Sequence, residues 1–169
     1  MPAFAENTIL IDSNETNLTE FSSGYFIDAN NLSFNEIKQA RFIDGGSCYS
    51  LGTNAKNTWV KVGLKNNTSH AQKLYLHMPE AFHNKQVAFY ETSSNGKLLN
   101  QAIIDLNHAQ DSPYIFQGSA IYEFGLSPQE IKHIYIQSVS FSHQWFTLKI
   151  LDENHSKRVL ANTYNYIFF

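Results

Sequence analysis

One alternating segment constrains the fold of this chain more than any other feature. Val60, Val62 and Leu64 occupy every second position, and Trp59 and Lys61 occupy the alternate positions just before and just after Val60. Successive side chains of a β-strand point to opposite faces, so the three aliphatic residues share one face. The alternation predicts a strand with one buried face and with a tryptophan and a lysine together on the other.

The outward pair of this strand has two interpretations. Trp59 and Lys61 are half of a binding surface, in which an aromatic face and an ammonium group meet a ligand. In the alternative, Trp59 packs under a loop and Lys61 is a solvated side chain. The sequence leaves both open.

Further strand patterns follow along the chain, separated by turn signals. They cover residues 21–27, 72–78, 86–91, 97–104, 114–117, 120–126, 133–139 and 144–151. In the last of these, Phe146, Leu148 and Ile150 are expected to point inward. Asn95-Gly96 is a strong hairpin signal. Repeated short strands with such punctuation predict an antiparallel β-sandwich or barrel.

One short helix interrupts the strands. Ser33 and Glu36 form the pattern of a capping box, and Phe34 and Ile37 follow at helical spacing, which predicts a helix near residues 34–40. The aromatic end of the chain, residues 163–169, is either a last strand or the lead-in to a following segment.

The composition limits the partners. Charged residues make up only 16% of the chain and the net charge is -3, whereas nucleic-acid surfaces carry clustered Lys and Arg. Nucleic acid is therefore not an expected partner. Hydrophobic residues make up 43% and aromatic residues 14%, as in a globular chain rich in sheet-forming residues.

No pattern of catalytic or metal-binding residues stands out. Cys48 is the only cysteine, so it forms no internal disulfide, and it lies in no recognisable nucleophile motif. His70, His77 and His83 do not have the spacing of a zinc site. The sequence predicts a non-enzymatic protein with no metal and no cofactor.

The chain reads as an N-terminal segment, residues 1–19, followed by a single domain over residues 20–169. Ala3-Phe4-Ala5 has the A-x-A form of a signal-peptidase site, so the first segment is interpreted as one that follows or contains a cleavage site. No apolar run approaches the roughly 20 residues that span a bilayer.

An ordered series of weak motifs adds a family resemblance over roughly residues 20–152. The motifs are Tyr25-Phe26-Ile27-Asp28 with Leu32 and Ile37, then Phe42, Gly52 before Trp59-Val60-Lys61, Leu64 and Asn66, Val87-Ala88-Phe89-Tyr90 before Gly96, and Tyr135-Ile136-Gln137. In this order they resemble the periplasmic sensing domain of bacterial seven-transmembrane receptors with diverse intracellular signalling modules, specifically the second extracellular domain type.

The resemblance implies a jelly-roll β-sandwich like that of carbohydrate-binding modules. It also implies a periplasmic location, as the extracytoplasmic domain of an inner-membrane receptor, with a transmembrane region downstream in the same polypeptide. The implied ligand is a carbohydrate or related small molecule. The family often has arginine where Lys61 and Gln137 stand, and lysine keeps the charge of arginine without its bidentate fork.

The outward residues of several strands are the candidate ligand-binding set, because a sugar site combines aromatic faces with convergent polar groups. They are Trp59, Lys61, Tyr75, His77, Tyr135, Gln137 and Trp145. Two other functions stay open besides ligand sensing. One is a protein-interaction or dimerisation module without a small ligand, which includes a homodimer. The other is an accessory carbohydrate-binding domain of a secreted enzyme.

Overall fold

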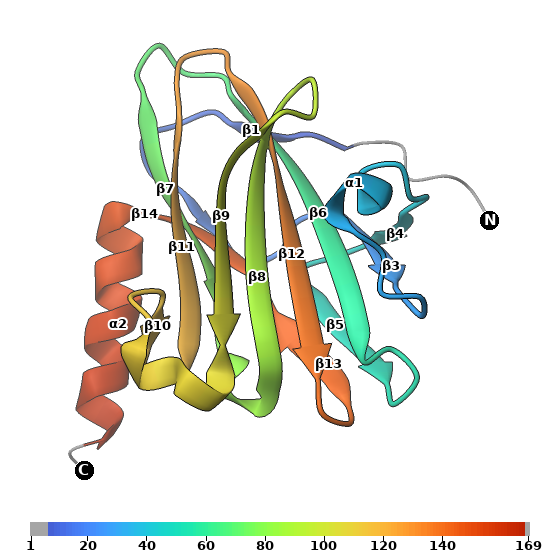
Figure 1. The fold of residues 1–169 in the computed structure, drawn as a ribbon. Helices are drawn as coiled ribbons and strands as arrows, with labels where there is room; N and C mark the ends of the chain where they lie inside the picture. Colours follow the sequence, from blue (N-terminus) through green and yellow to red (C-terminus); the bar gives the residue numbers. More distant parts are fainter. Residues whose placement is uncertain (1–6, 168–169) are drawn as a thin grey trace.

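Two β-sheets pack face to face and enclose the main core (Figure 1). The computed structural model describes residues 7–167, with side chains through residue 162, so Ala3-Phe4-Ala5 lies outside the described part. The larger sheet has the order β4-β3-β6-β12-β8-β9, with β1 also paired to β6. Its strands are β1 (Ile9–Ile11), β3 (Ser23–Ile27), β4 (Ile43–Gly45), β6 (Asn57–Asn66), β8 (Asn84–Ser93), β9 (Leu98–Asp105) and β12 (Ile131–Ser140).

The smaller sheet faces the larger one and has the order β10-β11-β7-β14-β2. Its strands are β2 (Asn17–Leu18), β7 (Gln72–Met78), β10 (Ile115–Phe116), β11 (Ser119–Leu126) and β14 (Lys149–Asp152). A separate ribbon joins β5 (Cys48–Gly52) to β13 (Gln144–Thr147). The helical elements are α1 (Phe34–Ile37), α2 (Glu153–Ile167) and the 3-10 turns η1 (Ala81–His83) and η2 (Leu106–Asp111).

The predicted fold class is confirmed: the protein is an all-β, jelly-roll-like sandwich. Val60, Val62 and Leu64 are fully buried in the main core, as their alternation predicted. The pairing of β1 with β6 is parallel, while the other strand pairs of the described part are antiparallel. Of the segment interpreted as leading the domain, residues 7–19 contribute β1 to the larger sheet and β2 to the smaller one.

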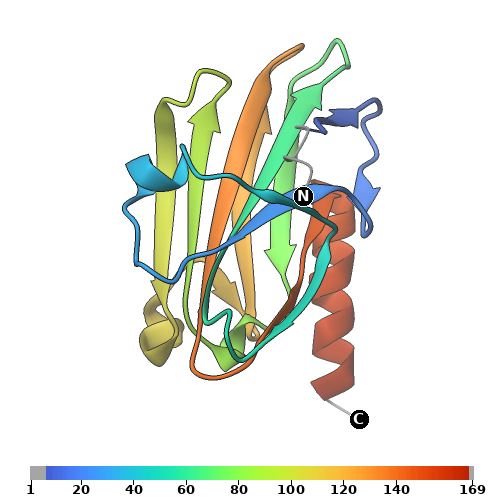
Figure 2. The same cartoon turned by 90° about the vertical axis from the view of Figure 1, so that its right-hand side faces the viewer.

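The predicted short helix is present and crosses the outer face of the larger sheet (Figure 2). Ser33 caps α1 and Glu36 bonds back to the Ser33 backbone, so the capping box is confirmed. The helix ends at Ile37, earlier than residue 40. Ile37 and Phe34 pack onto the sheet and form a second, smaller core there.

Two sequence predictions near the C-terminus need correction. The segment 144–151 is not one strand: it divides around Leu148 into β13 and β14, which belong to different sheets. Phe146, Leu148 and Ile150 are nonetheless buried as expected. The alternative of a last strand is wrong as far as Ile167, because these residues belong to α2. Phe168 and Phe169 lie outside the described residues.

Helix α2 lies along the outer face of the smaller sheet (Figure 1). The His77 ring on β7 and the Ser156 hydroxyl on α2 form a buried hydrogen bond of 2.8 Å that fixes the helix to the sheet. Within the described residues, no helix has the length and apolar character needed to cross a membrane.

Candidate functional site

The predicted ligand-binding residues lie on separate surfaces. Trp59 and Lys61 on β6 lie beside Gln137 and Tyr135 on β12, on the outer face of the larger sheet. Tyr75 and His77 lie on β7, in the opposite sheet, and Trp145 lies on the separate β5–β13 ribbon. Because the main core separates the two sheets, these residues do not line one groove.

Trp59 is a core residue, so the structure selects the packed alternative for it. Its side chain is only 2% exposed. The Phe34 ring stacks on it at a centroid distance of 6.1 Å, and the indole nitrogen donates to Asp28 Oδ2 over 3.3 Å. The outer face of a strand is solvated only when no other segment covers it. Here the segment from Asp28 to Phe42 crosses the outer face of β6 and covers Trp59.

Asp28 organises the segment that covers Trp59. Its buried carboxylate also accepts hydrogen bonds from the backbone amides of Asn30 and Leu32 and from the Asn57 side chain. The carboxylate thereby closes the turn before α1 and ties it to β6. The role of Asp28 is structural.

Lys61 and Tyr135 lie side by side, although Tyr135 is only 4% exposed. The Lys61 ammonium lies 5.6 Å from the centre of the Tyr135 ring. Both line a shallow polar hollow of about 290 Å³, together with Lys38, His133 and the hairpin residues around Asn95. Gln137 points elsewhere, because its amide donates to Asn57 Oδ1 over 2.9 Å.

His77 and Trp145 have local structural partners. Burial lowers the pKa of His77 to about 4, and Lys149 adds to this effect, so the ring is neutral under α2. The Trp145 ring stacks on His83 with ring centroids 4.0 Å apart. Neither residue faces a described hollow.

A cleft of about 680 Å³ lies at the open edge of the sandwich, where β8 and β9 face β11. Tyr75 is the one predicted site residue that lines it. The lining residues are Lys73, Tyr75, Glu91, Asn100, Pro113, Tyr114, Phe116, Ile121, Tyr122, Glu123, Phe124, Gly125 and Leu160. Five of these thirteen residues are aromatic, and four others carry charged or amide groups.

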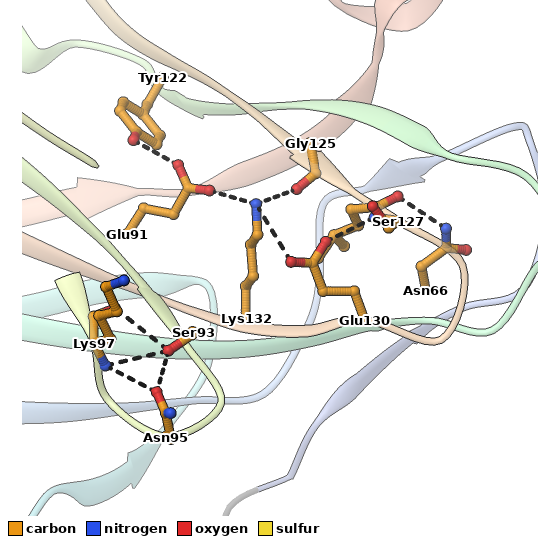
Figure 3. Close-up of polar contacts among 11 residues, drawn as sticks. Asn66, Glu91, Ser93, Asn95, Lys97, Tyr122, Gly125, Ser127, Glu130 and Lys132 are labelled. Carbon is orange, nitrogen blue, oxygen red and sulfur yellow. Dashed lines mark hydrogen bonds and ion pairs between the residues drawn. The ribbon is translucent and has the colours of Figure 1, made fainter. Parts of the chain in front are cut away.

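The polar groups of this cleft centre on Glu91 (Figure 3). Its Oε2 accepts from the Tyr122 hydroxyl over 2.8 Å, and its Oε1 accepts from the Lys132 ammonium over 2.7 Å. Lys132 also donates to the Gly125 carbonyl over 2.7 Å. A buried carboxylate is stable only when it is paired and hydrogen-bonded, as it is here.

The environment of Tyr122 keeps its hydroxyl protonated. Burial, followed by the hydrogen bond to Glu91, raises the pKa of Tyr122 well above its usual value, so its hydroxyl remains a donor. The Glu130 carboxylate lies 3.8 Å from the Lys132 ammonium and also accepts from the Ser127 amide, which fixes the turn between β11 and β12. The ammonium position is thus set from two sides.

The sequence contained a signal for this cleft that the alternation analysis did not use. On β8, Val87 and Phe89 point inward, and Glu91 occupies the next inward position. A carboxylate in an apolar series requires a partner across the core, and Tyr122 supplies it from β11. A charged residue within an apolar series therefore indicates a candidate site, but only the folded structure shows which residue is its partner.

The two packed sheets define an all-β, jelly-roll-like sandwich domain with a cleft at one edge. The family described as 7TMR-DISM extracellular 2 matches residues 22–152, and the chain belongs to this family. Its members are extracellular domains of seven-transmembrane receptors, which locates the chain outside the cytoplasm. No curated protein matches the chain by sequence.

The solved structures that the chain resembles are distant in sequence. A β-1,3-glucan-binding CBM6 from Bacillus halodurans shares 9% identity, with 86% of this chain and 98% of that chain covered and a TM-score of 0.37. TmCBM61 in complex with β-1,4-galactotriose shares 8%, with 79% and 88% covered and a TM-score of 0.39. Ruminococcus gnavus β-glucuronidase shares 8%, with a TM-score of 0.43; 76% of this chain is covered but only 22% of the enzyme.

Proposed function

We propose that the chain is a non-enzymatic, periplasmic ligand-sensing domain of a membrane signalling receptor, and that it binds a carbohydrate-like small molecule in the edge cleft. The observation that carries this proposal is the combination of aromatic walls with the Glu91 carboxylate and the Asn100 amide in one hollow. Its volume of about 680 Å³ lies within the range of about 300–1,000 Å³ typical of small-molecule sites.

The chemistry of the lining suits a hydroxylated ligand. Tyr75, Tyr114 and Phe116 present aromatic surface, against which the apolar face of a sugar ring packs. Asn100 offers both donors and acceptors to hydroxyl groups. Lys73 and Glu123 form an exposed ion pair of 2.9 Å at the rim, so the charges there are balanced and favour a neutral ligand.

The predicted site is revised accordingly. Tyr75 is retained as a proposed ligand contact, and Lys61 is kept as part of a secondary polar surface, whereas the Tyr135 ring beside it is buried. Trp59, His77, Gln137 and Trp145 are assigned to packing or local hydrogen bonding.

The cleft also suggests how binding reaches the rest of a receptor. Leu160 of α2 lines the hollow, so an occupant contacts the C-terminal helix as well as the sheets. A ligand shifts a two-state receptor only when it binds one state better than the other. We infer that contact with α2 supplies this difference and passes it to a transmembrane region downstream in the same polypeptide.

A thermal-shift screen of neutral mono- and oligosaccharides, followed by calorimetric titration of any hit, tests the proposal. Asn100→Ala should weaken binding of a hit about tenfold, since it removes hydrogen bonds worth about 1 kcal/mol or more. Asn35→Ala, an exposed asparagine on α1, is the matched control and should bind as the original chain does. Recovered sugars should be chemically unchanged after incubation.

Two results would contradict the proposal. One is the absence of any stabilisation across the sugar panel. The other is equal affinity for a hit in the Asn100→Ala and Asn35→Ala proteins, which would move the ligand out of the cleft.

A further inference from the structure

Exposed aromatic rings gather at one end of the sandwich. Among the phenylalanine, tyrosine and tryptophan side chains that the structure describes, only Phe82, Phe141 and Trp145 are exposed, at 67%, 59% and 36%. Phe82 belongs to η1 between β7 and β8, Phe141 to the turn between β12 and β13, and Trp145 to the start of β13. None of the three lines the edge cleft, so the proposed ligand site does not account for them.

Helix α2 ends at this same end of the sandwich. In both views the β7–β8 and β12–β13 connections lie at the lower end of the sheets, and α2 runs from β14 down to that level (Figure 1, Figure 2). The receptor part of the proposed function places a transmembrane region downstream of α2. The end that carries the three rings is therefore the end nearest the bilayer.

The turn that presents Phe82 is built around this ring. The Phe82 amide donates to the Gly118 carbonyl over 3.1 Å. A Cβ on Gly118 would lie 3.0 Å from Phe82 Cδ1, so the ring rests on a glycine. Glu80, just before η1, has a φ of 61°, which is uncommon for a residue with a side chain. Unusual backbone at a turn that keeps a large ring in solvent indicates a use for the ring.

Trp145 is held beside Phe82. Its ring stacks on His83, and the His83 ring nitrogen Nε2 donates to the Trp145 carbonyl over 2.8 Å. The Phe82 ring lies on the other side of the link, with its centroid 6.0 Å from that of His83. Two connections that are distant in sequence thus present their rings together.

The turn that carries Phe141 is fixed as well. The Ser140 amide donates to the Lys56 carbonyl of the β5–β6 loop over 2.7 Å, and the Ser140 hydroxyl donates to the His143 carbonyl over 2.7 Å. Loops that are already ordered lose little conformational entropy when they dock.

The surroundings of the rings favour an apolar partner over a charged one. The connections at this end carry exposed groups of both signs, among them Lys56 and Lys85 on one side and Glu80 and Asp111 on the other. Tryptophan is enriched where a membrane meets water, and exposed tryptophan and phenylalanine side chains bury themselves at the boundary of headgroups and acyl chains.

We propose that Phe82, Phe141 and Trp145 form a membrane-contacting surface, which rests the domain on the periplasmic face of the lipid bilayer and fixes the orientation of α2 relative to it. The inference rests on the receptor part of the proposed function. It needs no ligand in the edge cleft, and a negative result in the sugar screen leaves it unchanged.

Trp145 itself reports the contact, because the other tryptophan, Trp59, is only 2% exposed. The chain is held by a C-terminal polyhistidine tag on phosphatidylcholine vesicles that contain a nickel-chelating lipid. Brominated acyl chains quench a tryptophan that enters the lipid interface, so the emission should be lower on brominated vesicles than on unbrominated ones. Trp145→Phe keeps an aromatic ring and should abolish this difference.

Variants of the other two rings show whether the contact uses the whole surface. The double variant Phe82→Ala/Phe141→Ala should reduce the bromine-dependent quenching about threefold or more, since interfacial binding scales with the apolar area that is buried. Leu10→Ala/Leu99→Ala removes exposed aliphatic side chains near the opposite end of the sandwich and should be quenched as the original chain is. Circular dichroism of each variant checks that the domain is folded.

Four outcomes would overturn the inference. One is an original chain whose emission is the same on brominated and unbrominated vesicles. Another is a Phe82→Ala/Phe141→Ala protein that is quenched as strongly as the original chain. Quenching that requires anionic phosphatidylglycerol would assign the contact to the lysines instead of the rings. A Trp145 emission that shifts with protein concentration, without vesicles, would assign the surface to a second copy of the chain.

Discussion

The Tyr122 hydroxyl on β11 donates to Glu91 Oε2 on β8 over 2.8 Å, and this bond joins the two sheets at the edge of the sandwich. Both residues are buried, Tyr122 at 1% and Glu91 at 6% exposure. Phe89 stacks on the Tyr122 ring at 5.2 Å, so the ring is held while its hydroxyl reaches the carboxylate. The contact is part of the proposed ligand cleft and of the core at once.

We expect Tyr122→Phe to lower the free energy of unfolding by about 1.5–3 kcal/mol, because a buried hydrogen bond to a charged acceptor is lost. Lys132 still pairs with Glu91, so the fold should be retained. Tyr114→Phe, in the same aromatic cluster, is the control and should change stability less. Urea unfolding of both variants measures this, and equal values would contradict the stated role of the hydroxyl.

Trp59→Ala should lower the free energy of unfolding by about 3–5 kcal/mol, as large-to-small core substitutions do. The reason is that Trp59 is buried under α1 and is bonded to Asp28. Lys61→Ala on the same face should cost about 0.5 kcal/mol, near the value of an exposed cation–π contact. Urea unfolding gives both values.

The second tryptophan provides a matched control. Trp145 is 36% exposed and stacks on His83, so Trp145→Ala should cost only about 1 kcal/mol. If Trp59→Ala were no more damaging than Trp145→Ala, Trp59 would not be the core residue described above.

Stability should fall as the pH is lowered from about 6.5 towards 4. The pKa of His77 is lowered by burial to about 4 in the folded chain, from an ordinary value of 6.5. Between these values the unfolded chain binds more protons than the folded chain, so protonation favours unfolding. A difference of one pKa unit between the folded and unfolded chain corresponds to about 1.4 kcal/mol of folding free energy. His77 should therefore account for a loss of about 2–3 kcal/mol of stability at pH 4.

His77→Gln tests this assignment, because glutamine keeps a hydrogen-bonding group near Ser156 and does not titrate in this range. Thermal unfolding measured at several pH values should show a smaller loss between pH 6.5 and 4 in the variant. A profile that is parallel to that of the original chain would assign the acid sensitivity to other groups.

The sequence predicted the elements whose signals are local. Alternation in β6 identified Val60, Val62 and Leu64 as core, and the Ser33–Glu36 pair located the start of α1. Such patterns depend on neighbours within a few residues, so a single chain displays them directly. The family resemblance was likewise correct, because it rests on the order of these same elements.

The ligand-binding site was harder to predict than the strands. Alternation indicates that two residues point outward, but it does not show to which of the two sheets each residue belongs. Tyr75 and Tyr135 both read as outward aromatics, yet they lie in opposite sheets. The segment from Asp28 to Phe42 then covers Trp59, and α2 covers His77. Each of these outcomes depends on how segments distant in sequence pack.

By itself, then, the sequence determined the strand faces, the capped helix and the family, since local periodicity and short-range hydrogen bonding define them. Only the tertiary structure decided that Glu91 meets Tyr122 across the sandwich, 31 positions apart in the chain, and that β9 ends a sheet with one edge open. The physical reason is that burial and strand pairing are properties of the assembled sheets. The sequence of one strand shows that a buried polar group needs a partner, but it does not show which residue that partner is.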